Sequence, residues 1–464
     1  MKYVVTWAFW AGVIWLIRRD TARRDGISWA LWIPTLWVGI LASRPMSMWL
    51  GFGGATDTLE GSPLDRLVYT VLIVAAVVTL FRRGIDWSVV ISRNWPVLLF
   101  YFYLLISVLW ADTPFVSFKR WFKDFGGVLV ALVVLTEVNW QQAFRAVFVR
   151  CAYVLIPLSV ILIRYFPDRG RYYTKFGGLQ ITGVGAQKNS LGAMVLVCGL
   201  VLIWDWLERS RDRDDAVRQR WFDRYLPAGL LAIGVYLLYL CDSKTSIACL
   251  VVGGCILAAT RLPLLRTRIS ALGICVVAAG IGLYVLDSVF GLKEELVQSV
   301  GRDMTLTGRT EVWHELLALK TDPIVGTGFC SFWSDEFYQS RLPEWLAEGR
   351  SAHDGFLEMY LDGGILGLFF LGLMLVVIGL RINRQLGEGG YYPVVRFAVF
   401  VVMLVANLTE SHFGRMSPVG FLFLLAALDP PAAQEEHTSQ EILQGGPTLT
   451  EEWADSTLWP GSHS

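Results

Sequence analysis

The chain has 464 residues, of which 54% are hydrophobic and only 17% are charged, and its formal net charge is zero. Soluble domains carry about 25% charged residues, so this composition excludes an ordinary soluble globular protein. The balanced charge and the lack of a basic arm also exclude a typical nucleic-acid-binding protein, and we expect no nucleic acid among its partners.

Apolar runs recur along the chain, each flanked by Arg, Lys, Asp or Trp, which is the pattern of repeated transmembrane helices. We therefore predict an all-α fold, a polytopic bundle of about 12–13 spans in a lipid bilayer. The first run is short and the last two are joined by few residues, so 12 spans remain an alternative to 13. The predicted spans are 3–17, 27–43, 64–81, 95–110, 125–138, 146–164, 191–207, 225–241, 244–260, 271–290, 363–381, 394–409 and 414–428.

The arginine-rich connections all fall on one side of the membrane if every predicted span is real. Because positive residues favour the cytoplasm, this side is predicted to be cytoplasmic, which places the N-terminus outside. These connections are 18–26, 82–84, 208–224, 261–268 and 381–384. The opposite, outer side then holds the loops 44–63, 111–124, 165–190, 291–362 and 410–413.

Composition divides the chain into two predicted parts. We expect a transmembrane domain over 1–428, with its catalytic loop at about 291–362, and a disordered cytoplasmic tail over 429–464. The tail is rich in Pro, Gln, Glu, Thr and Ser, a composition that cannot bury a core. The loop, at about 70 residues, is far longer than ordinary connections, and long loops on a rigid scaffold usually carry function.

Two polar motifs on the outer side each begin a predicted span. Lys188 and Asn189 lie in ITGVGAQKNSLGA (181–193), and Lys244 lies in CDSKTS (241–246), a short step between two apolar runs. All three are candidate substrate-binding residues, because polar groups at the membrane boundary must find partners. A snorkelling lysine at a span end and a plain turn of a helical hairpin remain the alternative interpretations.

The motif TLTGRTEVWHELL (305–317) places Arg309 near the N-terminus of a predicted helix, which is the less favourable end for a cation. An anion shared between the guanidinium and the free amide groups of the first turn would explain this placement. A surface arginine paired with Glu311 is the alternative. Further outer cations run against the positive-inside bias and also favour a bound anion. They are Arg164, Arg169 and Arg171.

The stretch SAHDGFLEMYLDGGILGLFF (351–370) places His353 where a polar loop meets an apolar helix. The apolar residues that follow have helical spacing, so His353 is predicted to lie on or near a packed face. They are Phe356, Leu357, Tyr360 and Leu361. An imidazole close to several cations is suited to act as a general base near neutral pH. A hydrogen-bonded histidine at a capped helix start is the alternative.

The convergent cations and the single histidine together favour a lipid-linked diphosphate as substrate. Its departing charge needs Arg or Lys as electrostatic stabilisers, and an acceptor hydroxyl needs a base. The outer loops contain no acidic pair with metal-like spacing such as DxD, and the chain contains no CxxC pair. We therefore predict a metal-independent reaction without a cofactor.

Five motifs in this order resemble the O-antigen ligase/polymerase superfamily, a family of polytopic membrane glycosyltransferases. The motifs are QKNSLG, SKTS, TGRTEVW, PIVGTGF (323–329) and AHDGFLE followed by GGILG. The stretch SRPMSMWLG (43–51) is similar to the exopolysaccharide-production branch of that family. The resemblance is strongest over 181–370, and the span pattern extends it over most of the chain.

The resemblance implies transfer of an oligosaccharide from a polyprenyl-diphosphate carrier to a glycan or lipid A-core acceptor, at the periplasmic face of the bacterial inner membrane. It implies that His353 activates the acceptor hydroxyl, with net inversion at the anomeric carbon, and that Arg309 and Lys188 contact the diphosphate. Other polysaccharide-assembly proteins are expected partners. The candidate site residues are His353, Arg309, Lys188, Asn189, Lys244, Arg164, Arg169, Arg171 and Asp354.

The chain departs from the family pattern at two positions. Family members commonly carry a histidine before the Lys-Asn pair, where this chain has Gln187, so a second catalytic histidine is excluded there. An asparagine often follows the loop histidine, where this chain has Asp354. A carboxylate at that position would orient the ring of His353.

Polymerase and ligase activities both remain open, and the exopolysaccharide-like stretch favours a polymerase. A transporter or flippase of the same lipid-linked glycans is the alternative function. That class predicts charged residues deep within spans, and the apolar runs contain almost none. No GxSxG or HExxH motif supports an intramembrane hydrolase.

Overall fold

The described chain is almost entirely helical, which confirms the all-α prediction. The computed structural model describes residues 2–24, 26–51, 62–173, 178–210, 221–259, 309–343, 346, 351–388 and 390–431. The first helices are α1 (Lys2–Thr21), α2 (Trp32–Leu41), α3 (Met46–Leu50), α4 (Pro63–Arg82), α5 (Trp87–Ser107), α6 (Pro114–Leu135), α7 (Trp140–Tyr165) and α8 (Pro167–Gly170). The later helices are α9 (Lys188–Arg209), α11 (Trp221–Cys241), α12 (Lys244–Ala259), α16 (Arg309–Ala318), α17 (Glu336–Gln339), α19 (Gly355–Glu388), α20 (Tyr392–Asn407) and α21 (Pro418–Ala427). Single 3₁₀ turns, η1 (Trp29–Leu31) and η2 (Val108–Trp110), lie before α2 and after α5.

Every predicted span except one coincides with a described helix, although several helices are shorter than a full span. The exception, 271–290, lies outside the described residues. Among the described helices, six are long and apolar enough to cross a membrane, namely α4, α5 with η2, α7, α9, α11 and α19. Shorter apolar helices, among them α12, α20 and α21, fill the bundle between them. The chain is therefore a multi-pass helical membrane protein.

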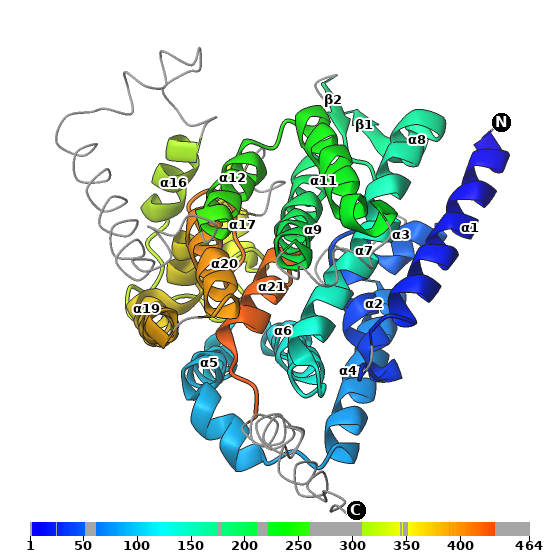
Figure 1. Ribbon diagram of the computed structural model, residues 1–464. Coiled ribbons are helices and arrows are strands. Elements are labelled where there is room, and N and C mark those ends of the chain that lie inside the picture. Colours follow the sequence, from blue (N-terminus) through cyan, green and yellow to red (C-terminus); the bar gives the residue numbers. More distant parts are fainter. Residues whose placement is uncertain are drawn as a thin grey trace, which may run out of the picture.

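The helices α7 and α9 form the centre of the bundle (Figure 1). In each of them 78% of the most apolar window is buried inside the protein, against 22% in α4. Helix α9 packs against α7, α11, α12 and α21. Phe144 of α7 meets Trp204 of α9 edge to face, with ring centroids 5.3 Å apart. Helix α9 is thus held in a packed core.

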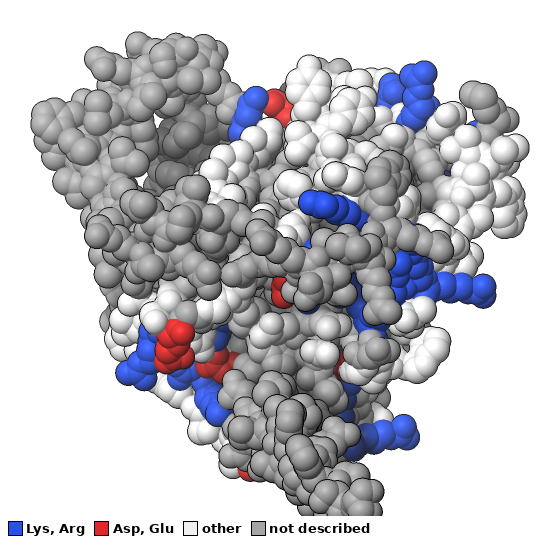
Figure 2. Space-filling model, in the orientation of Figure 1, with Lys and Arg blue, Asp and Glu red and all other residues white. Residues whose placement is uncertain are grey.

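The outer helices present apolar side chains to their surroundings. Figure 2 shows the described charged side chains of one face in small groups, with uncharged described residues between some of them. Many large apolar side chains of the described chain are strongly exposed, and such exposure on a soluble protein would be a liability. Examples are Trp7, Leu67, Val71, Phe81 and Tyr239. Contact with lipid accounts for this surface.

The PIVGTGF motif packs against a kink in α19. Gly364 interrupts the helix with φ +60°, and a Cβ there would overlap the carbonyl group of Ile324. The backbone of the motif then satisfies the freed carbonyl groups, because Thr327 N donates to Leu361 O at 2.9 Å and Gly328 N donates to Asp362 O at 2.8 Å. Two motifs far apart in sequence therefore form one structural unit.

Arg44, in the SRPMSMWLG stretch, holds the segment that leads into α9. Its Nε donates to Gly185 O at 2.9 Å, and its Nη2 donates to Gly183 O at 3.1 Å and to Arg169 O. This segment contains the antiparallel hairpin of β1 (Arg171–Tyr173) and β2 (Leu179–Ile181). Burial, and secondarily the charge of Arg169, lower the pKa of Arg44. The guanidinium replaces the hydration of several loop carbonyl groups at once.

Buried ion pairs lie near the arginine-rich connections of α1, α7 and α9. Asp20 accepts from Arg24 at 2.7 Å and from Arg150 at 3.0 Å, and Asp205 accepts from Arg209 at 2.8 Å. Both aspartates are buried. The Asp20–Arg150 pair joins α1 to α7, and the Asp205–Arg209 pair lies within α9, so these charges have a structural use within the bundle.

The chain remains attached to the bundle just after α21. Asp429 Oδ1 accepts from Arg396 Nη1 at 2.6 Å, and its backbone N donates to Asn94 Oδ1 at 2.8 Å. The rest of the predicted tail, 432–464, lies outside the described residues. The division of the chain into a transmembrane domain and a tail stays a prediction.

Candidate functional site

The starts of three helices meet at the loop 408–417, which joins α20 to α21. Asn189, in the first turn of α9, donates from Nδ2 to Glu410 Oε1 at 2.8 Å. His353, just before α19, places Nδ1 3.5 Å from Glu410 Oε2. Thr245, in the first turn of α12, has its hydroxyl 2.7 Å from that of Thr409. The QKNSLG, SKTS and AHDGFLE motifs are therefore neighbours in space.

His353 has an uncommon backbone conformation for a residue with a side chain, with φ at +51°. Its backbone N donates to Ser351 Oγ at 3.1 Å. The side chain is 39% exposed, yet its Nδ1 is buried and makes no hydrogen bond within the described chain. The ring thus has one accessible edge and one edge that faces the Glu410 carboxylate.

Asp354 caps α19. Its Oδ1 accepts from the backbone N of Phe356 and of Leu357, each at 2.8 Å, as an aspartate does at an N-cap. Gly355 then lies so close to the end of α20 that a Cβ would overlap Asn407 Oδ1. These contacts fix the position of the residue before them, His353.

Lys188 and Lys244 each begin a helix. Lys188 is the first residue of α9 and is half-buried, and Gln187 before it makes no side-chain capping bond. Lys244 Nζ lies 2.6 Å from Asp242 Oδ1, and both of these side chains are more than half exposed. An exposed ion pair of this kind is weak, so Lys244 is able to exchange its partner for a ligand. The substrate role of both lysines stays a prediction.

Arg309 is the first residue of α16, and its side chain lies outside the described part of the structure. The helix itself is anchored beside His353, because Trp313 Nε1 donates to Ala352 O at 2.9 Å. Leu316 of α16 is buried in the same small core as Ala352. The TGRTEVW motif is thereby joined to the loop that carries His353.

The three arginines of the 164–171 segment lie at the end of α7 and the start of the hairpin. Arg164 and Arg169 are exposed, and Arg171 Nε donates to Ile163 O at 3.3 Å. The described chain does not join any of them to His353 by a hydrogen bond or ion pair. They stay candidate diphosphate ligands.

Arg415 connects the loop 408–417 to α19. Its Nη2 donates to Glu358 Oε2 at 3.0 Å and to Asp362 Oδ2 at 2.8 Å. Glu358 also accepts from Ala352 N at 2.9 Å. Both carboxylates are buried, and the positive guanidinium of Arg415 compensates their negative charges. This cluster fixes the loop beside His353.

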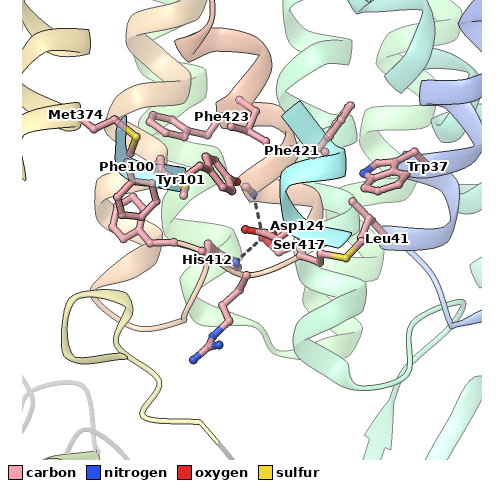
Figure 3. Close-up of a pocket in the computed structure, with 18 residues that line it drawn as sticks. Trp37, Leu41, Phe100, Tyr101, Asp124, Met374, His412, Ser417, Phe421 and Phe423 are labelled. Carbon is pink, nitrogen blue, oxygen red and sulfur yellow. Dashed lines mark hydrogen bonds between the residues drawn. The ribbon is translucent and has the colours of Figure 1, made fainter. Parts of the chain in front are cut away.

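A cavity of about 30 Å³ lies behind the loop 408–417 (Figure 3). His412 Nδ1 lies 3.1 Å from Ser417 Oγ, which also accepts from Gly420 N at 2.9 Å. Burial lowers the pKa of His412 to about 4, with a smaller opposing effect of Glu410. His412 is therefore neutral at physiological pH and is part of the packed loop.

Metal ligation is not evident in the described ranges, where no three His, Cys, Asp or Glu side chains are placed to hold an ion. The metal-independent mechanism stays a prediction that chelation tests.

Sequence reasoning missed Glu410 and Arg415. Both lie in TESHFGR (409–415): Glu410 falls in the predicted outer loop 410–413, whereas Arg415 falls in the predicted span 414–428, although α21 begins only at Pro418. The density of polar residues in this connection was the available signal, because polar side chains at a membrane boundary must be satisfied.

Comparison with known proteins gives two matches. The family model described as O-Antigen ligase matches residues 228–372, a range that includes Lys244, Arg309 and His353. The Exopolysaccharide production protein ExoQ of Rhizobium meliloti (strain 1021) is 26% identical over 303 residues. That alignment covers 62% of this chain and 65% of the relative, so the chain matches slightly less than two thirds of the relative's length.

Proposed function

We propose that this chain, whose residues 228–372 match the O-Antigen ligase family model, is a membrane glycosyltransferase of polysaccharide assembly. It moves an oligosaccharide from a polyprenyl-diphosphate carrier to a glycan acceptor at the periplasmic face of the bacterial inner membrane. The observation that carries the proposal is the meeting of Asn189 and His353 at Glu410.

His353 acts as the general base. The ring lies just before α19, with one edge exposed and the other facing a carboxylate. The acceptor hydroxyl loses its proton to this ring while its oxygen attacks the anomeric carbon, which inverts that centre. A base positioned beside the reacting bond commonly contributes on the order of 10²–10⁴ in rate.

Arg309 and Lys188 stabilise the leaving diphosphate. Each is the first residue of a helix, α16 and α9, where free backbone amides and the positive end of the helix dipole already favour an anion. The added side-chain charges take up the charge that develops as the bond to the carrier breaks. Side-chain cations thus serve where other enzymes use a metal ion.

The acceptor is a second carrier-linked repeat in a polymerase and a lipid A-core sugar in a ligase. The name of the relative concerns exopolysaccharide production, and the SRPMSMWLG stretch resembles that branch. We therefore favour polymerisation of exopolysaccharide repeats.

The test is transfer by the purified protein in vesicles. Defined carrier-linked repeats are supplied with or without a lipid A-core acceptor, and the products are sized. A polymerase gives longer carrier-linked chains without lipid A-core, whereas a ligase needs it. Repeats that cross the vesicle membrane without any new glycosidic bond would indicate a flippase and contradict the proposal.

A further inference from the structure

Glu410 bridges two helices that carry candidate site residues. One oxygen, Oε1, accepts from Asn189 Nδ2 at 2.8 Å, and the other, Oε2, lies 3.5 Å from His353 Nδ1. The contact with Asn189 spans 221 residues of sequence. One carboxylate therefore links the start of α9, beside Lys188, to the residue proposed as the base.

His353 Nδ1 requires a partner of this kind. The atom is buried and makes no hydrogen bond within the described chain, and a buried polar atom left in that state is destabilising. Glu410 Oε2 is an acceptor that lies at 3.5 Å. Hydrogen bonds of catalytic groups are often long in the free enzyme and tighten with substrate. A proton on Nδ1, facing this carboxylate, leaves Nε2 free to accept another.

The loop around Glu410 is braced, so the carboxylate is in place before substrate arrives. The hydroxyl of Thr409 lies 2.7 Å from that of Thr245 on α12. Asn407 Oδ1 accepts from the backbone N of His412 at 2.8 Å. A group that orients another needs this kind of rigid support.

We propose that Glu410 is a positioning residue, which holds His353 in the tautomer protonated at Nδ1 and stabilises the imidazolium that forms during transfer. This role rests on the proposed function. The acceptor oxygen bonds to the anomeric carbon while the bond from that carbon to the diphosphate oxygen breaks, and the electron pair leaves with the carrier diphosphate. The hydroxyl proton moves to His353 Nε2 and is later lost to solvent.

Asn189 has a supporting part in this arrangement. Its amide occupies Oε1, which leaves Oε2 directed at the imidazole. Because Asn189 follows Lys188, the proposed diphosphate contact and the base share one rigid connection. Asn189→Ala therefore lowers kcat less than loss of the carboxylate does.

The experiment compares kcat and KM for a carrier-linked repeat in vesicles containing wild type, Glu410→Gln or Glu410→Asp. Glutamine has nearly the same shape, but its amide donates to Nδ1 and favours the opposite tautomer. We expect kcat to fall by about 10²-fold or more, with donor KM little changed. Glu410→Asp keeps the charge and restores part of kcat. Glu336→Gln, an exposed site on α17, is the matched control and retains wild-type kcat.

Epistasis then separates positioning from a structural role. Added to His353→Ala, Glu410→Gln causes no further loss, because it acts through the missing ring. A further loss, or near wild-type kcat in Glu410→Gln, overturns the positioning role. If Glu410→Gln does not fold, the test rests on Glu410→Asp, which keeps the charge. A complete loss of kcat in Glu410→Asp contradicts the proposal. An inactive wild type instead overturns the proposed function, and this role with it.

Discussion

Two carboxylates lie close to His353 and serve different purposes. Asp354 directs Oδ1 at two backbone amides of its own helix, each at 2.8 Å, and so begins α19. Glu410 comes from a distant loop and directs Oε2 at the imidazole. Asp354 therefore stabilises the start of α19, whereas Glu410 is the carboxylate proposed to act on the protonation of the ring.

Substitution of Asp354 tests the capping assignment. Asn is as good an N-cap as Asp, whereas Ala removes the acceptor for both amides, so Asp354→Ala should lose roughly 0.5–2 kcal/mol of stability. Asp354→Asn should retain both the thermal midpoint and most transfer activity. Thermal unfolding followed in detergent provides the measurement. Loss of transfer in a stable Asp354→Asn variant would show that the charge itself has a role in the site.

His412 makes the stability of the loop depend on pH. Burial lowers its pKa in the folded protein from 6.5 to about 4. Between these two pH values the unfolded chain binds a proton at His412 and the folded chain does not. The contribution of the neutral, buried His412 to the free energy of unfolding is therefore complete above pH 6.5 and is lost as the pH falls to 4.

Replacement of His412 should remove this dependence. In His412→Gln the thermal midpoint should fall less between pH 6.5 and 4 than in wild type. The matched control, His314→Gln, changes an exposed histidine of α16 and should leave the wild-type slope intact. An unchanged slope in His412→Gln would mean that other groups cause the acid sensitivity.

At the scale of elements, the kink in α19 organises the site. The segment before the kink begins at the N-cap residue Asp354. It also contains the buried carboxylates of Glu358 and Asp362, which accept hydrogen bonds from Arg415. The residues after it belong to the most apolar of the six long helices. Gly364 makes this change of direction possible, and the loop 323–329 fills the space beside it.

Gly364→Ala should distort this unit. The substitution forces a side chain into a positive-φ position against Ile324, and overpacking of this kind costs roughly 1–3 kcal/mol. Gly372→Ala in the same helix meets no atom within 4 Å and should not destabilise the protein. Thermal midpoints of the two variants provide the comparison. Equal midpoints would show that the kink tolerates a side chain.

At the scale of the whole molecule, the arrangement of spans predicts that the site and the tail lie on opposite sides of the membrane. The N-terminal end of α1 and the last described residues lie at opposite ends of the bundle (Figure 1). The proposed site lies at the helix starts at 188, 244, 309 and 355. The arginine-rich connection 208–224 follows α9, and Arg381 and Arg384 lie near the far end of α19, as the positive-inside tendency requires of cytoplasmic turns.

Cysteine labelling tests this sidedness. A cysteine at exposed Glu336 should react with a membrane-impermeant maleimide in spheroplasts, whereas one at Arg384 should react only after permeabilisation. The unsubstituted protein, with its native cysteines, sets the background. The reverse pattern would invert the topology and place the site in the cytoplasm.

The sequence was sufficient for the helices but not for all of the site. Long apolar runs predicted every described helix of ten residues or more except α16, because span length is a local property. The motifs also predicted a cluster at the helix starts. Glu410 and Asn189 are 221 residues apart, and their contact depends on how α9 packs against α12 and α21, which no local pattern specifies. The capping role of Asp354 was accessible in principle, since aspartate before a helix is a common start signal.

The central claim is that His353 is the base for glycan transfer from a carrier diphosphate. The most direct measurement is single-turnover transfer of a carrier-linked repeat in vesicles by wild type, His353→Ala and His314→Ala, with equal insertion confirmed for all three. We expect His353→Ala to slow transfer by on the order of 10²-fold or more, and His314→Ala to match wild type. A His353→Ala protein that transfers at the wild-type rate would contradict the account.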